Sequence, residues 1–438
     1  MEQNRKTLGQ LFFPICIETL FYMMAGMVDT LMLSTVGDQA VGAVGTANTY
    51  IGMFIIMFSV TSNGMMAVMT QNIGAGKPGI AYQAKQLGAI FNAALGIVLG
   101  AALFFFGGDI LNMVGIADSL REPAETYLQI VGGSCFLNAL IPIFAGYLRA
   151  FGFMHQSLTA TIIANVLNLV LNAVFLFGFD MGVVGVATAT VISKVVNLAI
   201  VFFISLKLVN AKDDPHRLSN GEIMKQIVKI GFPSALETAL YNLAMTLMIR
   251  FLNQMDLEGL NVTARSYTAQ ITHFSFSVGA ALAQANAIMT GWRVGAKDYE
   301  ACDKGTKKAA VIGIIIAIII ESCFAIFAEP IMSLFTDDPE MIALASKLLF
   351  IDIFLEIGRV SNLVFGNALK VSGDAVYPVI IAAVFMYLCA VGGTYFFGIH
   401  LELMAVGAYI GLTLDECVRA VAMFLRWQSG KWREKAIV

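Results

Sequence analysis

Charged residues are scarce in this chain of 438 residues. Asp, Glu, Lys and Arg make up 13% of it, whereas 58% of its residues are hydrophobic and its mean hydropathy is +0.78. Soluble domains carry about 25% charged residues, and disordered chains carry few large hydrophobic ones. The composition therefore excludes a soluble or disordered protein and indicates many membrane-spanning segments.

Residues that commonly carry catalysis, metals or disulfides are also few and poorly spaced. The six cysteines show neither metal nor disulfide spacing, and we interpret them as small buried side chains. The stretch Gly74–Lys77 resembles a phosphate-binding loop only in composition, because the required spacing is missing and Pro78 follows. We therefore predict no enzyme activity, no cofactor, and no binding of nucleotide or nucleic acid. Energy for any active transport would have to come from an ion gradient.

Long apolar runs, by contrast, are abundant. A helix rises about 1.5 Å per residue, so about 20 apolar residues cross a hydrocarbon core of about 30 Å. We predict a transmembrane helix in each of twelve stretches: 8–34, 44–70, 86–107, 124–148, 157–179, 182–206, 226–251, 264–291, 306–328, 341–369, 375–398 and 403–425. The predicted fold class is an all-α polytopic membrane protein.

The two halves of the chain repeat one another. A shift of 219 residues, half the chain length, superposes Pro14 on Pro233 and Glu18 on Glu237. Six spans in each half give both halves the same orientation in the membrane. We therefore predict two parallel six-helix bundles, a 6+6 duplication, in which access to a substrate site alternates between the two sides of the membrane.

This duplication sets the predicted domain boundaries. The N-lobe comprises residues 1–206, a basic linker comprises 207–225, and the C-lobe with a short tail comprises 226–438. Most lysines and arginines lie in the loops on the side of the N-terminus, among them Lys85 and Lys304. By the positive-inside rule, both termini and the linker are cytoplasmic, and we expect the protein in the plasma membrane.

Two acids lie within the first apolar stretch. An ionised acid at mid-membrane costs roughly 2.5–3.5 kcal/mol on insertion scales, so Glu18 and Asp29 need a reason to be there. One reason is a structural hydrogen bond to a neighbouring helix. The other, which we favour, is a site for a proton, a metal cation or a cationic substrate. The second half keeps the first acid as Glu237 but has Met248 at the position of Asp29.

The tenth apolar stretch carries a second group of charges. Glu356 and Arg359 are three residues apart and can pair within the membrane, and Asp352 lies one turn earlier. These residues could form a charge relay with Glu237, or a buried ion pair that fixes helix packing. The sequence favours neither.

Several motifs together resemble the multidrug and toxic compound extrusion (MATE) family. The first span contains P-x-x-x-E (Pro14–Glu18) and V-D-T (Val28–Thr30), and T-Q-x-x-G-A-G (Thr70–Gly76) follows the second. The fifth contains L-N-x-x-L-N-x-x-F-x-x-G (Leu167–Gly178). In the tenth, E-x-G-R-x-x-N (Glu356–Asn362), followed by A-L-x-x-x-G-D, is similar to the prokaryotic DNA-damage-inducible branch. The resemblance spans all twelve predicted helices.

The resemblance implies a V-shaped pair of bundles and cation-coupled export of organic cations. It places the coupling acid at Asp29, with Asn168 and Asn172 lining the same cavity, and these three could also ligate Na⁺. Asn165 and Thr188 are weaker candidates beside them, and Glu18 is a candidate relay residue. An alternative is that Asp29 and the two amides only clamp two helices together.

The C-lobe departs from the sodium-binding branch of the family. Glu237 matches a coupling acid, but Arg359 stands where that branch has an aspartate, which leaves Asp352, Glu356 and Arg359 as relay candidates. The resemblance leaves open H⁺ or Na⁺ as the coupling ion. We expect a monomer in the lipid bilayer that handles small organic cations. The alternatives are a flippase for lipid-linked saccharides of the same superfamily, and a membrane protein that transports nothing.

Overall fold

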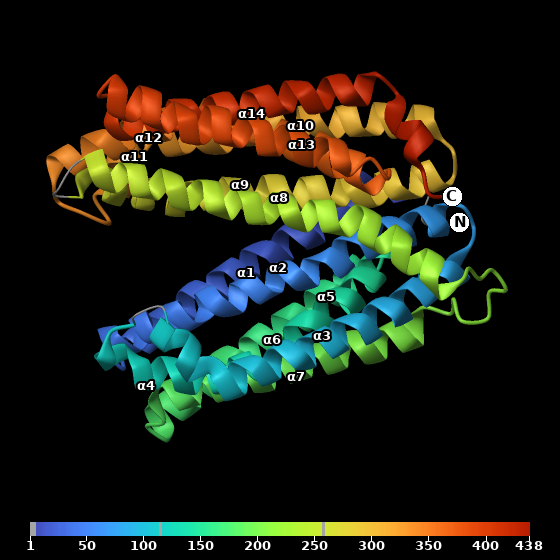
Figure 1. Ribbon diagram of the computed structural model, residues 1–438, viewed down its shortest axis with the longest axis horizontal. Helices are drawn as coiled ribbons and strands as arrows, with labels where there is room; N and C mark the ends of the chain where they lie inside the picture. The colour runs from blue at the N-terminus through green and yellow to red at the C-terminus, as the bar shows by residue number, and fades with distance from the viewer. Residues whose placement is uncertain (1–5, 114–115, 256–258) are drawn as a thin grey trace. The chain divides into compact units, whose positions relative to one another are not determined.

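The structure is a computed structural model that describes residues 6–113, 116–255 and 259–438, and every regular element in these ranges is helical. The first half contains six helical rods, some of them interrupted by a π-helical segment (Figure 1). Their elements are α1 (Leu8–Ser34), α2 (Asp38–Gly74), α3 (Pro78–Met113), α4 (Asp118–Tyr127), η2 (Leu128–Gly132), α5 (Cys135–Ala150), α6 (Met154–Ala173), η3 (Val174–Gly178) and α7 (Gly182–Leu208).

The second half repeats this order. Its elements are α8 (Asn220–Met255), α9 (Leu260–Gly295), α10 (Tyr299–Ile326), α11 (Ala328–Met332), α12 (Pro339–Val371), α13 (Val376–Phe385), η4 (Met386–Val391), η5 (Thr394–His400), α14 (Met404–Gln428) and the terminal turn η6 (Lys431–Lys435). Each predicted span overlaps one of these rods. The rods generally extend further than the predicted spans, because a helix continues after its apolar stretch ends.

By length and apolarity alone, seven of the described helices could cross a membrane. An eighth span is formed if the stretch 118–132 and α5, which meet at 42°, are counted together. The long helices outside this set are α8, α9, α12 and α14, and they carry polar and charged side chains of the C-lobe. Such side chains lower the mean hydropathy of a helix and mark it as a candidate for function.

The chain forms two compact units that we call the N-lobe and the C-lobe. The N-lobe contains residues 1–6 and 13–232, and the C-lobe contains residues 7–12 and 233–438. These bounds differ from the predicted ones, because the linker and the first residues of α8 group with the N-lobe and the first turn of α1 groups with the C-lobe. Both helices change lobe beside a proline inside the helix, Pro14 or Pro233.

Each lobe has its own apolar core. In the N-lobe, buried side chains of α2, α3, α4 and α7 pack together, and Phe58, Leu103 and Leu128 are among the largest of them. In the C-lobe, one cluster joins α8, α12 and α14, and another places Trp427 and Trp432 in a stacked pair with ring centroids 4.2 Å apart. These cores hold the helices that carry the acids described next.

Candidate functional site

In the N-lobe, Asp29 of α1 is clasped by two amides of α6. Nδ2 of Asn172 donates to Oδ1 of Asp29 over 2.7 Å, and the same nitrogen lies 3.3 Å from Oδ1 of Asn168. The two asparagines are four residues apart, so they occupy one face of α6. Both are buried, whereas Asp29 remains partly exposed. The structure thus brings together the three residues that the sequence predicted as a group.

The Asn168 amide can serve either protonation state of Asp29. Its terminal atom that faces the carboxylate lies 2.8 Å from Oδ1 and 3.2 Å from Oδ2 of Asp29. If that atom is nitrogen, it donates to an ionised carboxylate. If it is oxygen, the 2.8 Å contact requires a proton on Asp29 that the amide oxygen accepts. A rotation of the amide by half a turn exchanges the two arrangements.

The surroundings of Asp29 include groups that the sequence did not single out. The buried Tyr127 interacts electrostatically with Asp29. Asn48 and Thr190 lie beside the Tyr127 hydroxyl. The amine of Lys194 also acts electrostatically on Asp29, although no ion pair forms between them. Lys194 had given no signal in sequence, because nothing within its own helix pairs with it.

Two weaker candidates do not join this cluster. The hydroxyl of Thr188 donates to the Val184 carbonyl over 2.7 Å, so it is used within its own helix. Thr190, two residues later, is the threonine of α7 that approaches Tyr127. Asn165 lies one turn before Asn168, and its buried Nδ2 has no hydrogen-bond partner among the described residues.

Glu18 has a different environment from Asp29. Its Oε1 accepts hydrogen bonds from Nη2 of Arg149 at 2.9 Å, from Ser157 at 3.0 Å and from Thr161 at 2.9 Å. Arg149 belongs to the last turn of α5. One cation and two hydroxyl donors thus converge on a single oxygen of Glu18. Its geometry is that of a structural ion pair between α1 and α5.

Glu237, the counterpart of Glu18, repeats this arrangement. Its Oε2 lies 2.6 Å from Nζ of Lys370, near the end of α12. Arg149 and Lys370 occupy matching places in the stretches YLRAFG and ALKVSG of the two halves. The acid on the first helix and the base at the end of the fourth span were therefore both kept after duplication. Comparing those two stretches would have revealed the basic partners.

The predicted pair of Glu356 and Arg359 forms within α12 and extends to α14. Nη1 of Arg359 donates to Oε1 of Glu356, and its Nε lies 3.6 Å from Oε1 of Glu416. Arg419 contacts Asp415 at 2.6 Å and Glu416 at 2.9 Å. A network of ion pairs thus links α12 and α14, and Glu237 is paired with Lys370.

Asp352 and Glu321 lie at the edge of this network. Asp352 is 2% exposed and Glu321 is fully buried, and neither forms an ion pair among the described residues. Asp352 and Glu356 are the acids that act on Glu321 electrostatically. Glu321 gives no signal in the sequence, because its acidic neighbours Asp352 and Glu356 lie on another helix.

The donor sets differ in what they could bind. In the described ranges, no group of three or more His, Cys, Asp or Glu side chains is arranged to hold a metal ion. Asp29, Asn168 and Asn172 supply oxygen atoms of the type that Na⁺ accepts, so this set fits a proton or a single sodium ion.

A protein-family model matches both halves of the chain. The model of the MatE family matches residues 14–174 and 233–396, once in each half. The chain belongs to the MATE family. Its members are transporters, so the chain is a multi-pass membrane transporter and not an enzyme.

Individual MATE relatives match over nearly the full length. The chain is 34% identical to an uncharacterized transporter, YisQ, of Bacillus subtilis, over 98% of this chain and 96% of the relative. It is 24% identical to the probable multidrug resistance protein NorM of Thermotoga maritima, over 99% and 94%. A crystal structure of a MATE protein in a bent conformation superposes with a TM-score of 0.89 at 21% identity, covering 98% and 96% of the two chains. The last match establishes the twelve-helix, two-lobe MATE fold.

Proposed function

We propose that this MATE transporter is a secondary active antiporter that exports small organic cations in exchange for protons. The observation that carries the proposal is the clasp of Asp29 by Asn168 and Asn172. The relatives named as probable multidrug resistance proteins support the export of small molecules. Asp29 binds the coupling ion, and the two lobes provide alternating access.

The amides explain how Asp29 could bind and release a proton. Asn172 donates to the carboxylate in either state, and Asn168 can donate or accept after a rotation of its amide. Because neither partner carries a charge, neither locks Asp29 in its ionised form. A charged partner, such as the one that Glu18 has in Arg149, would do so.

Protons rather than sodium ions are the coupling ions that these residues favour. Na⁺ prefers several oxygen ligands, and this site offers the oxygens of three side chains, Asp29, Asn168 and Asn172. A proton on Asp29 only neutralises a charge and requires no further ligands.

The free energy that an inward proton supplies depends on the charge of the exported substrate. We place the protein in the plasma membrane with both termini in the cytoplasm. Asp29, near the end of α1, then lies in the outer half of the bilayer. One charge moved inward gains about 2.3 kcal/mol per 100 mV. That would sustain a roughly 50-fold gradient of a neutral substrate. One-for-one exchange with a monovalent cation moves no net charge, so for such a substrate the pH difference is the driving force.

The surface around α1 and α2 suits apolar cations. Met24, Met27, Met53 and Met57 have side chains that are 44% to 58% exposed. Flexible thioethers adapt to ligands of different shape, and the nearby carboxylate of Asp29 provides negative charge. We expect a monomer to be the working unit.

The test uses purified protein in vesicles and a fluorescent cationic dye. A proton gradient should drive dye transport by the wild type, and Asp29→Asn should abolish it while leaving equilibrium dye binding nearly normal, because the amide keeps the shape but cannot titrate. Asp109→Asn, the same change at an exposed site of α3, is the matched control. Glu237→Gln should impair transport less, since Glu237 is tied to Lys370. Full activity of Asp29→Asn would refute the assignment of Asp29. Dye transport driven by a sodium gradient but not by a proton gradient would show that Na⁺ is the coupling ion.

A further inference from the structure

Acids outnumber bases in the core of the C-lobe. Five carboxylic acids are at most 4% exposed: Glu321 on α10, Asp352 and Glu356 on α12, and Asp415 and Glu416 on α14. The only bases that form ion pairs with this set in the described ranges are Arg359 and Arg419. If all five acids were ionised, the cluster would carry a large net negative charge in a low-dielectric core.

The two arginines are already engaged by three of the acids. Arg359 pairs with Glu356 and approaches Glu416. Arg419 bridges Asp415 and Glu416, and Glu416 also accepts a hydrogen bond of 2.9 Å from Asn362. Glu321 and Asp352 are therefore the two acids that remain without a basic partner.

Their carboxyl oxygens also lack donors. Both oxygens of Glu321, Oδ2 of Asp352 and Oε2 of Glu356 have no hydrogen-bond partner among the described residues. An ionised carboxylate with neither a cation nor a donor is strongly disfavoured away from water. A carboxyl group in that position becomes stable by taking up a proton.

Arg359 of α12 acts on Glu321 electrostatically without forming an ion pair with it, and the other described elements near Glu321 offer it no ion-pair partner. On α9, the hydroxyl of Ser275 lies beside it, but Arg265 is directed towards Met245 at 3.8 Å and His273 contacts Ser277 of its own helix. On α14, the buried Tyr409 interacts electrostatically with Glu321. The acid of α11, Glu329, is exposed.

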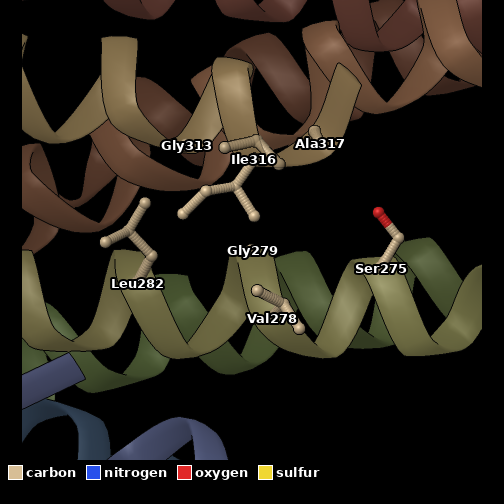
Figure 2. A pocket seen from close by; sticks show the side chains of 8 residues that line it. Ser275, Val278, Gly279, Leu282, Gly313, Ile316 and Ala317 are labelled. Atoms are coloured by element: carbon tan, nitrogen blue, oxygen red, sulfur yellow. The ribbon is translucent and has the colours of Figure 1, made fainter. Parts of the chain in front are cut away.

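A narrow packing gap between α9, α10 and Val360 of α12 does not solvate the acid either. It is lined by Val278, Gly279, Leu282 and their neighbours on α10, with Ser275 at one end as its single hydroxyl (Figure 2). It is too narrow to hold a water molecule. Glu321 follows one turn after Ala317, which also lines this gap, and is itself fully buried.

We propose that Glu321 and Asp352, next to the Glu356–Arg359 pair, form a proton-binding site in the C-lobe that is separate from Asp29. Its ligand is the proton, because the described residues offer no group of side chains arranged for a metal ion. The site holds protons at neutral pH, whether or not Asp29 couples transport. The C-lobe therefore has a proton site of its own, built from α10 and α12 instead of α1 and α6.

Infrared spectroscopy tests this directly, since a protonated carboxyl group has a carbonyl stretch that an ionised one lacks. Purified Asp29→Asn protein at neutral pH, in a detergent without ester groups, should keep this band. Adding Glu321→Gln should remove part of it, and adding Asp352→Asn as well should remove the rest. Adding Glu329→Gln instead, at the exposed acid of α11, should leave the band unchanged. Absence of the band from Asp29→Asn would overturn the proposal without any C-lobe variant having to fold.

A second measurement follows the stability of the folded protein with pH. A buried carboxyl that is neutral when folded but ionised when unfolded makes the protein less stable as pH rises. The wild type should therefore lose thermal stability towards alkaline pH, and Glu321→Gln should lose less of it. Equal slopes in the two proteins would contradict a proton on Glu321. Transport assays of Asp29→Asn bear only on the antiport proposal, so the two proposals can fail separately.

Discussion

Glu18 and Asp29, two acids of the first helix, differ in the charge of their hydrogen-bond partners. Glu18 is held by the cation of Arg149 and two hydroxyls, whereas Asp29 is held by neutral amides. A cation fixes the charge of a carboxylate, and an amide leaves it free to titrate. This contrast favours a structural role for Glu18 over the relay role predicted from the sequence, and it supports the proposal that Asp29 carries the coupling ion.

A double-mutant cycle tests the structural role of Glu18. Arg149→Met should leave the Glu18 carboxylate with only hydroxyl donors and lower the free energy of unfolding by about 3 kcal/mol. Glu18→Gln combined with Arg149→Met should recover much of that loss, because no unpaired charge remains. Thermal unfolding in detergent measures both effects. A double variant as unstable as Arg149→Met alone would show that the pair contributes little.

How far the sequence predicted these residues depends on where their partners lie. Asn168 and Asn172 repeat at a helical spacing, and Glu356 and Arg359 do the same, so each pair was visible along the chain. Glu321 was overlooked because its neighbours Asp352 and Glu356 lie on another helix. Contacts between distant helices depend on packing, which local spacing does not report.

At the scale of elements, glycines decide how closely α10 and α12 approach. A Cβ atom at Gly313 would lie 2.5 Å from Cγ1 of Val360 and 2.9 Å from Cδ2 of Leu282. A Cβ at Gly279 would lie 2.7 Å from Cγ2 of the same valine. Val360 is thus seated against glycines of α9 and α10, and Arg359 precedes it on α12. The two glycines help to set the position of the ion-pair network.

Gly313→Ala should therefore overpack this contact and cost about 1–3 kcal/mol of unfolding free energy. Gly366→Ala is the control in the same lobe, because its new Cβ would meet only Oδ1 of Asn362 at 3.9 Å. Adding Val360→Ala to Gly313→Ala should restore part of the stability by removing the methyl groups that collide. If Gly313→Ala unfolds at the same temperature as Gly366→Ala, the close approach is not limiting.

The Asp214 carboxylate is one of the groups that fix the loop 209–219, between α7 and α8, against α3. Oδ1 of Asp214 accepts hydrogen bonds from the backbone of His216 at 3.0 Å and of Gly79 at 3.2 Å. Partial desolvation raises the pKa of Asp214, but the hydrogen bonds from His216 and Gly79 outweigh it and hold the pKa below its usual value. The stabilisation is therefore fully present at neutral pH and is lost as acid protonates Asp214.

Asp214→Ala should loosen this loop at pH 7. Amide hydrogen exchange in residues 212–219 should become faster than in the wild type, because Gly79 and His216 lose their acceptor. Asp213→Ala changes the neighbouring exposed acid and should have little effect. Unchanged exchange in Asp214→Ala would mean that other contacts, such as that of Gln83 with the Leu218 carbonyl, hold the loop alone.

The helices themselves were the most predictable elements, for a physical reason. Backbone groups in a bilayer must be satisfied within the segment, so long apolar runs become helices irrespective of their neighbours. Breaks within a run were not predicted. The bend before α5 and the π-helical segments η3, η4 and η5 depend on packing and leave no apolar signature.

At the scale of the molecule, the charge of the loops predicts how the chain is oriented. Cysteine labelling can test this, because Cys16, Cys135 and Cys302 are buried and only Cys323, Cys389 and Cys417 need replacement by alanine. In that background, Leu334→Cys and Asp213→Cys place one thiol at an exposed position at each end of the helices.

The expected result follows from the positive-inside rule. The loop with Asp213 is flanked by Lys207, Lys212 and Arg217, whereas Leu334 lies among the acids Glu329, Asp337 and Asp338. An impermeant maleimide should therefore label Leu334→Cys in intact cells and should label Asp213→Cys only after the membrane is opened. The reverse pattern would place Asp29 in the cytoplasmic half of the bilayer. A proton bound there from outside could then no longer explain export, and the coupling scheme would have to be inverted.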